Sequence, residues 1–166
     1  MLPPERARPL LTAAIDLLLI ALIAAAFVWP VFHLEYLDSW GSIESTFISD
    51  ARFLAGNSPH PLWQPNWYCG TRWDYIYPPG LRYGTAYIHK WTGVSVPRAY
   101  HIFIGLFYCA GIAGVYALVR AASKSRAGAW MAAVASLLIS PGYLFLPDFR
   151  ADVSSFLYLP NRLNVL

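Results

Sequence analysis

Three long stretches of the chain lack charge almost completely, and this pattern predicts three membrane-spanning helices. They are residues 10–32, 99–119 and 127–146. Asp16 and His101 are the only acidic or basic residues of the first two stretches, and the third has none. A hydrocarbon layer about 30 Å thick needs about 20 helical residues, and a helix satisfies its own backbone polar groups in lipid. The sequence therefore predicts an all-α integral membrane protein.

The first stretch also has features of a secretory signal peptide, since two arginines precede an apolar run that contains Ala24-Ala25-Ala26. The run continues to Phe32, however, which is longer than the apolar core of a signal peptide. Trp29-Pro30 near its end is typical of an anchor at the membrane interface. We therefore expect an uncleaved helix.

Basic residues in short segments predict the orientation. The link 120–126 contains three basic residues and no acid, and the tail 1–9 contains two arginines against Glu5. Such segments remain on the cytoplasmic side. Residues 33–98 and 147–166 are then extracytoplasmic, and we expect a bacterial inner or plasma membrane protein with a cytoplasmic N-terminus.

The composition agrees with this picture. Hydrophobic residues make up 57% of the chain and charged residues 13%, with a mean hydropathy of +0.43, whereas about a quarter of a soluble domain is charged. The net charge of +3 follows from topology, so no nucleic-acid partner is expected. Cys69 and Cys109 are predicted at different depths and should not pair. No zinc-ligand spacing occurs.

The C-terminal residues 161–166 form neither a cap nor an anchor, and three helices are few for so large an outer loop. We expect the N-terminal part of a larger polytopic protein, whose remaining helices would pack against these three beside the lipid bilayer.

The loop 33–98 holds five of the seven tryptophans and is too long for a simple connection. Apolar residues at helical spacing, from Ile43 to Leu54, predict an interfacial helix over about 40–55 that ends at Gly56. Prolines make 57–79 irregular, and a second short helix is expected over 81–91. The loop is thus a folded structure on the membrane face.

Acids gather at the start of this loop: Glu35, Asp38, Glu44 and Asp50. Carboxylates there can act as general bases or hold a divalent cation, although the cofactor remains open. The alternative roles are a helix cap for Asp38 and a solvated helix face for Glu44 and Asp50. Asp16 is a functional candidate by its depth. It could also reach the interface or pair with an absent helix, and we expect a structural pairing.

Aromatic and basic side chains follow along the loop. Trp67 and Tyr68, with their aromatic neighbours, are typical of a belt at headgroup depth, or would form a stacking platform for a sugar. Arg82, His89 and Lys90 would contact lipid headgroups, or bind a phosphate.

These features together resemble the start of the GT-C superfamily, polytopic glycosyltransferases that use polyprenyl-phosphate-linked sugars and carry a catalytic acid in the first outer loop. More closely, three segments are similar to uncharacterised bacterial membrane proteins labelled as related to 6-pyruvoyl-tetrahydropterin synthase. They are Asp38-Ser39-Trp40-Gly41-Ser42-Ile43-Glu44, Trp67-Tyr68-Cys69-Gly70 and Tyr77-Pro78-Pro79. The four histidines are scattered along the chain, so the zinc chemistry of the soluble pterin synthase is not expected.

The resemblance implies roles for particular residues. Asp38 is the first candidate for the base that deprotonates the acceptor, with Glu35 or Glu44 as helper or metal ligand. The leaving lipid phosphate would be stabilised by basic side chains from the set Arg72, Arg82, Lys90 and His60. Because Glu35-x-x-Asp38 replaces an adjacent acid pair or Asp-x-Asp, the choice of base stays open. The alternative function is a non-enzymatic membrane protein whose aromatic loop binds a glycan, a lipid or a partner protein.

Overall fold

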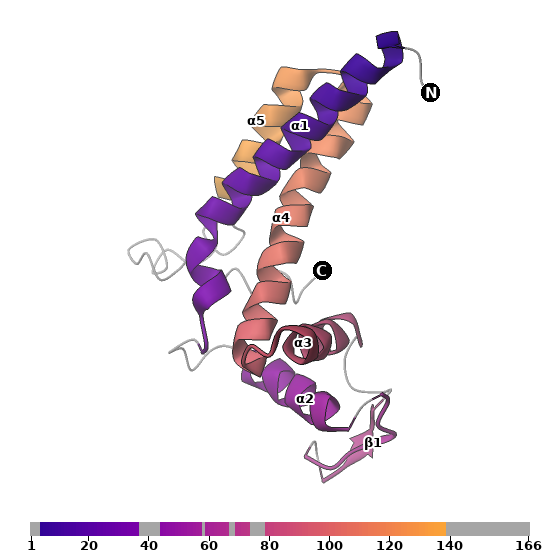
Figure 1. The fold of residues 1–166 in the computed structure, drawn as a ribbon, viewed down its shortest axis with the longest axis vertical. Helices are drawn as coiled ribbons and strands as arrows, with labels where there is room; N and C mark the ends of the chain where they lie inside the picture. Colours follow the sequence, from indigo (N-terminus) through magenta and orange to yellow (C-terminus); the bar gives the residue numbers. More distant parts are fainter. Residues whose placement is uncertain (1–3, 37–43, 58, 67–68, 74–78, 139–166) are drawn as a thin grey trace. The chain divides into compact units, whose positions relative to one another are not determined.

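The computed structural model describes residues 4–36, 44–57, 59–66, 69–73 and 79–138, and these form two compact units (Figure 1). The helical unit comprises residues 4–29 and 106–138, and the loop unit comprises the described residues between 30 and 105. The elements, in chain order, are α1 (Pro4–Phe27), the 3-10 helix η1 (Trp29–His33), α2 (Glu44–Gly56), β1 (Trp63–Gln64), β2 (Thr71–Arg72), α3 (Pro79–Thr92), α4 (Val96–Ser123) and α5 (Arg126–Leu138).

The helical unit contains α1, the later part of α4, and α5. Small residues such as Ala24, Ala129 and Ala133 are fully buried, which lets helix backbones approach closely. Large apolar side chains on all three helices, including Leu18 and Leu118, are exposed. Helices that are apolar on every side are typical of proteins surrounded by lipid.

Among the described residues, α4 is the one helix that is both long and apolar enough to cross a membrane, and the apolar part of α1, Leu11–Phe27, is shorter. The α4 helix extends beyond the predicted 99–119 at both ends. The first predicted helix, 10–32, is divided instead, because α1 ends at Phe27 and η1 follows. Pro30 explains the break, since it lacks an N–H group and disfavours the α conformation of the residue before it. Residues 139–146 of the third predicted helix lie outside the described residues.

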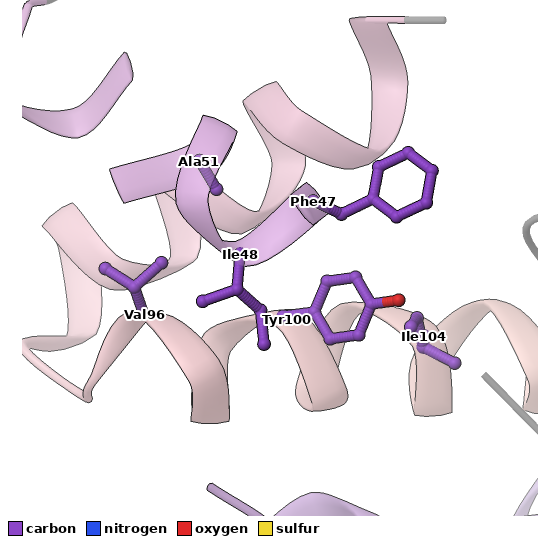
Figure 2. Packing of buried hydrophobic residues seen from close by; sticks show 6 residues of the cluster. All are labelled: Phe47, Ile48, Ala51, Val96, Tyr100 and Ile104. Atoms are coloured by element: carbon purple, nitrogen blue, oxygen red, sulfur yellow. The ribbon is translucent and has the colours of Figure 1, made fainter. Parts of the chain in front are cut away.

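The predicted interfacial helix at 40–55 corresponds to α2, although residues 40–43 lie outside the described part of the chain. Its apolar residues pack against the start of α4, and Figure 2 shows Ile48 pointing toward Val96 and Tyr100. Phe47, Ala51 and Ile104 complete this cluster. The first residues of α4 therefore belong to the core of the loop unit.

The region 57–79, predicted to be irregular, contains a short antiparallel pairing of β1 with β2, in which Trp63 lies opposite Arg72. The α3 helix starts at Pro79, two residues earlier than predicted, because proline fits the first turn of a helix. Gly93 ends it with a φ of 73°, the left-handed conformation that favours glycine. Gly84 lets α3 approach Phe103 of α4, since a Cβ there would lie 1.9 Å from the phenyl ring.

Candidate functional site

A buried polar cluster occupies the centre of the loop unit. It contains Asp50 of α2, Gln64 of β1, and Arg82 and Thr85 of α3, together with the ring of Trp73. Gln64 Nε2 donates a hydrogen bond of 2.9 Å to Asp50 Oδ1. Arg82 Nη1 lies 3.9 Å from Asp50 Oδ2, which is within ion-pair range but too long for a hydrogen bond. The cluster thus holds a carboxylate and a guanidinium that face each other without close contact.

Local structure positions each member of this polar cluster. In the two-residue strand β1, Trp63 is exposed and Gln64 is buried, as the alternation of a strand requires. Trp73 follows β2, and its backbone N–H donates a hydrogen bond of 3.1 Å to the carbonyl oxygen of Leu62. Its ring centroid lies 4.3 Å from Cζ of Arg82, a cation–π contact. The hairpin therefore closes over the charged groups of α2 and α3.

In this polar cluster, the negative charge of Asp50 is only partly compensated by its neighbours. Burial raises the pKa of Asp50 above its ordinary value of 3.8, while Gln64 and Arg82 lower it in part. Desolvation penalises the charged form. Trp73 Nε1 and Thr85 Oγ1 are also buried and have no hydrogen-bond partner among the described residues. Asp50 can therefore hold a proton, and Trp73 Nε1 and Thr85 Oγ1 are two additional hydrogen-bond donors.

A second buried pair joins α2 to α4. Glu44 Oε2 lies 3.4 Å from His101 Nε2, and both side chains are almost fully buried. His101 Nδ1 lies 3.0 Å from the carbonyl oxygen of Pro97, so this nitrogen carries a proton. The pair fastens the first turn of α2 to α4.

Glu35 lies at the surface, directly after η1. Its carboxylate accepts a hydrogen bond from the hydroxyl of Ser95, just before α4. Nearby, Arg98 Nε donates to the carbonyl oxygen of Phe32 at 3.3 Å. These two bonds attach the beginning of the loop to the beginning of α4 and leave an exposed carboxylate beside it.

A shallow hollow on the loop unit, with no room for a water molecule, is lined by aliphatic and aromatic side chains and by one lysine. Its lining residues are Leu54, Pro59, Tyr83, Ala86, Tyr87 and Lys90. His60 lies next to it, because its Nδ1 is hydrogen bonded to the Tyr83 hydroxyl and the two rings stack with their centroids 6.2 Å apart. An imidazole, an ammonium group and phenol rings thus share one surface.

The structure brings together only some of the predicted site residues. His60 and Lys90 lie beside this hollow, and Arg72 is exposed on β2. Arg82 is buried beside Asp50, and Glu44 is buried beside His101. Asp38, Trp67 and Tyr68 lie outside the described residues.

The alternative placement of Glu44 and Asp50 on a solvated helix face is wrong, since both side chains are buried. Gln64, Trp73 and Thr85 were not predicted as site residues. One signal was present in the sequence: Asp50 lies three residues after Phe47 and four before Leu54, in line with the apolar face of the helix. An acid on that stripe has to be buried.

In the helical unit, the structural pairing expected for Asp16 is confirmed, and its partners are Arg126 and Tyr116 of this chain. Its Oδ1 and Oδ2 accept hydrogen bonds of 2.7 Å from Arg126 Nη2 and Nε. Tyr116 donates to Oδ2 at 2.6 Å. A basic residue at the start of α5 therefore neutralises the buried acid of α1.

The described residues contain no group of three or more His, Cys, Asp or Glu side chains that could hold a metal ion. Cys69 and Cys109 are both free thiols. No protein-family model, curated protein or solved structure matches the chain.

Proposed function

We propose that this chain is part of a polytopic membrane glycosyltransferase of the GT-C type, with α1, α4 and α5 crossing the membrane. It would transfer a sugar from a polyprenyl-phosphate donor to an acceptor hydroxyl on the extracytoplasmic side. The N-terminus would then be cytoplasmic, as would the link between α4 and α5, whose basic residues favour that side.

One observation carries the proposal: an exposed carboxylate is fixed beside the N-terminal end of the apolar helix α4. Glu35 is held there by Ser95, and the first residues of α4 lie in the core of the loop unit. A donor with a lipid tail needs a reaction site at the boundary of the bilayer, because the tail stays in the bilayer while the sugar reacts in water. A carboxylate at the boundary can accept the proton of an acceptor hydroxyl.

The roles are assigned accordingly. Asp38 remains the first candidate for the base, and Glu35 assists it. His60 and Lys90, on the border of the hollow, would stabilise the charge that grows on the leaving phosphate, with Arg72 as a further candidate. Glu44 and Arg82 are buried in contacts of their own, and we assign them to holding the loop unit together.

The test compares acid variants of the protein expressed in membranes from its complete reading frame. Asp38→Asn and Glu35→Gln are assayed for transfer of labelled sugar from a mixed pool of polyprenyl-phosphate donors. Loss of a general base lowers the rate about 10²–10⁴-fold, and we expect a loss of this size for Asp38→Asn and a smaller one for Glu35→Gln. Glu5→Gln is the matched control, because Glu5 belongs to the predicted cytoplasmic tail.

Normal transfer by both loop variants at normal expression would refute the site assignment. An absence of transfer in the unaltered protein would favour the alternative, a membrane protein whose aromatic loop binds without catalysis.

A further inference from the structure

One side of α3 carries a row of aromatic side chains that begins at the edge of the core, where Tyr83 packs against it, and continues onto the surface. Tyr83, Tyr87 and Trp91 recur at intervals of four residues, which places them on one side of a helix. Neighbouring ring centroids are 6.3 Å and 5.5 Å apart. Tyr87 is 39% exposed, Trp91 is 80% exposed, and Lys90 beside them is also exposed. We call Tyr87, Lys90 and Trp91 the exposed edge of α3.

The remainder of α3 is already occupied. Arg82, Thr85 and Ala86 are buried in the loop unit, so α3 has one face in the core and another that is aromatic and basic. Contiguous exposed apolar surface of this kind marks an interaction site. Trp and Tyr rings with a neighbouring Lys are characteristic of helices that lie in the membrane interface.

The chain connection identifies the partner. Only Gly93, Val94 and Ser95 separate α3 from α4, and three residues span at most about 11 Å. If α4 crosses the bilayer, the C-terminal end of α3 is held within that distance of the point where α4 enters. The short link therefore favours a membrane surface as the partner of this edge.

The connection is also held by hydrogen bonds. His89 Nδ1 lies 2.6 Å from the carbonyl oxygen of Val94, and the N–H of Gly93 donates to the carbonyl oxygen of His89 at 2.9 Å. Thr92 Oγ1 donates to the carbonyl oxygen of Ile88 at 2.7 Å. A turn bonded in this way fixes the direction of α3 relative to the first residues of α4.

We infer that the exposed edge of α3 docks on the outer surface of the bilayer, with the rings of Tyr87 and Trp91 at headgroup depth and the Lys90 ammonium on an anionic lipid phosphate. Amphipathic rings suit this depth, because their apolar body faces the acyl chains while their polar atom stays hydrated. The inference rests on the membrane placement of α4 within the proposed function, but not on sugar transfer.

The experiment measures the environment of single labels on the full chain in phospholipid vesicles. A fluorescent thiol label is placed at position 87 or 91 in a Cys69→Ser/Cys109→Ser background. Quenching by a nitroxide on the lipid headgroup is compared with quenching by iodide in water. We expect lipid quenching to dominate at both positions. Leu62, which is 76% exposed in the same unit, is the control position and should be quenched mainly by iodide.

Lipid charge tests the role of Lys90. Vesicles of phosphatidylcholine are compared with vesicles that also contain phosphatidylglycerol, and the anionic lipid should raise lipid quenching at position 91. One basic residue near an anionic surface contributes about a fivefold change in partition, so Lys90→Glu should remove an effect of this size. Arg52→Glu, a matched change at an exposed position of α2, should leave it intact.

The outcomes separate this inference from the proposed function. A label at Leu106, an exposed residue of α4, reports whether α4 lies in the bilayer. Lipid quenching at 106 with iodide quenching at 87 and 91 would overturn the docking alone, as would equal lipid quenching at 62 and 91. Iodide quenching at all of these positions would overturn both the docking and the membrane placement. No effect of phosphatidylglycerol would overturn the assignment of an anionic headgroup.

Discussion

Each of the two units buries an aspartate, and the two aspartates are bonded very differently. Asp16 and Asp50 are both 1% exposed. Asp16 receives hydrogen bonds of 2.6–2.7 Å on both oxygens from Arg126 and Tyr116. Within the described part of the chain, Asp50 receives one bond, from Gln64, and its guanidinium partner is 3.9 Å away. Equal burial therefore does not mean equal compensation.

The difference in bonding marks Asp16 as a structural acid and Asp50 as the acid whose protonation can change more easily. A buried carboxylate with a bidentate arginine and a phenol has its charge fully compensated, and changing its protonation would break all three bonds. Asp50 retains part of its desolvation penalty, which is why its pKa is raised. Perturbed acids of this second kind are found preferentially at functional sites. Proton or ligand chemistry is thus favoured in the loop unit, and stability in the helical unit.

The largest loss of stability is expected for Arg126→Ala, which removes the arginine paired with Asp16. Removing one partner of a buried ion pair costs about 3–5 kcal/mol. Because the Arg126 side chain is 57% exposed, solvent screening weakens this effect. We still expect the largest loss of stability among these variants in detergent-solubilised protein. Thermal unfolding followed by circular dichroism measures it. Arg120→Ala, in the same basic link, is the control, and an equal loss in both variants would contradict a special role for the Asp16 pair.

Tyr116→Phe should have the next largest effect. It deletes the hydroxyl that donates to Asp16 and keeps the ring that packs edge-on against Trp130 with centroids 6.1 Å apart. A hydrogen bond to a charged group contributes about 1.5–3 kcal/mol, and Arg126 retains the charge here, so we expect about 1.5 kcal/mol. Tyr108→Phe is the control, since its hydroxyl donates to a carbonyl oxygen over 3.4 Å. A larger loss in that control would refute the ranking.

The pH dependence of the loop unit tests Asp50. The raised pKa means that the folded protein keeps a proton that the unfolded chain releases at 3.8. Stability should therefore fall as pH rises from 3.8 through the higher folded value, and level off above it. Asp50→Asn should flatten this dependence and change stability by less than about 1 kcal/mol at neutral pH, because the amide oxygen still accepts from Gln64.

Hydrogen exchange of the α2 backbone, measured across the acid range, reports this local stability. An unchanged pH profile in Asp50→Asn would show that another group carries the dependence.

Glu35 is the exposed acid to set beside Asp16 and Asp50, and we expect the smallest effect on stability from the loss of its hydrogen bond. Its bond from Ser95 lies at the surface, and bonds to exposed charges contribute about 0.2–1 kcal/mol. Ser95→Ala should lower protection of the η1 backbone by less than about 0.5 kcal/mol in hydrogen exchange. A loss as large as that of Tyr116→Phe would mean that this attachment is a main support of the loop unit.

Local pattern was sufficient to predict part of the loop. The helix at 44–56 and its apolar side followed from residues such as Phe47 and Leu54 at helical spacing, because periodicity reports which side must leave water. The same rule puts Asp50 on the apolar side but does not identify the partners of Asp50 and Glu44. Those partners, Arg82 and His101, lie far along the chain and are brought near only by the packing of α3 and α4 against α2.

The sequence by itself determined that the chain is mostly helical, that α4 is apolar and long enough for a membrane, and that an amphipathic helix follows the first apolar stretch. These properties depend on composition and on spacing over a few turns. Only the tertiary structure decided which acids are compensated. It paired Asp16 with Arg126 and left Asp50 loosely paired with Arg82. The physical reason is that the energy of a buried charge is set by the groups within a few ångströms of it, and those groups come from distant segments of the sequence.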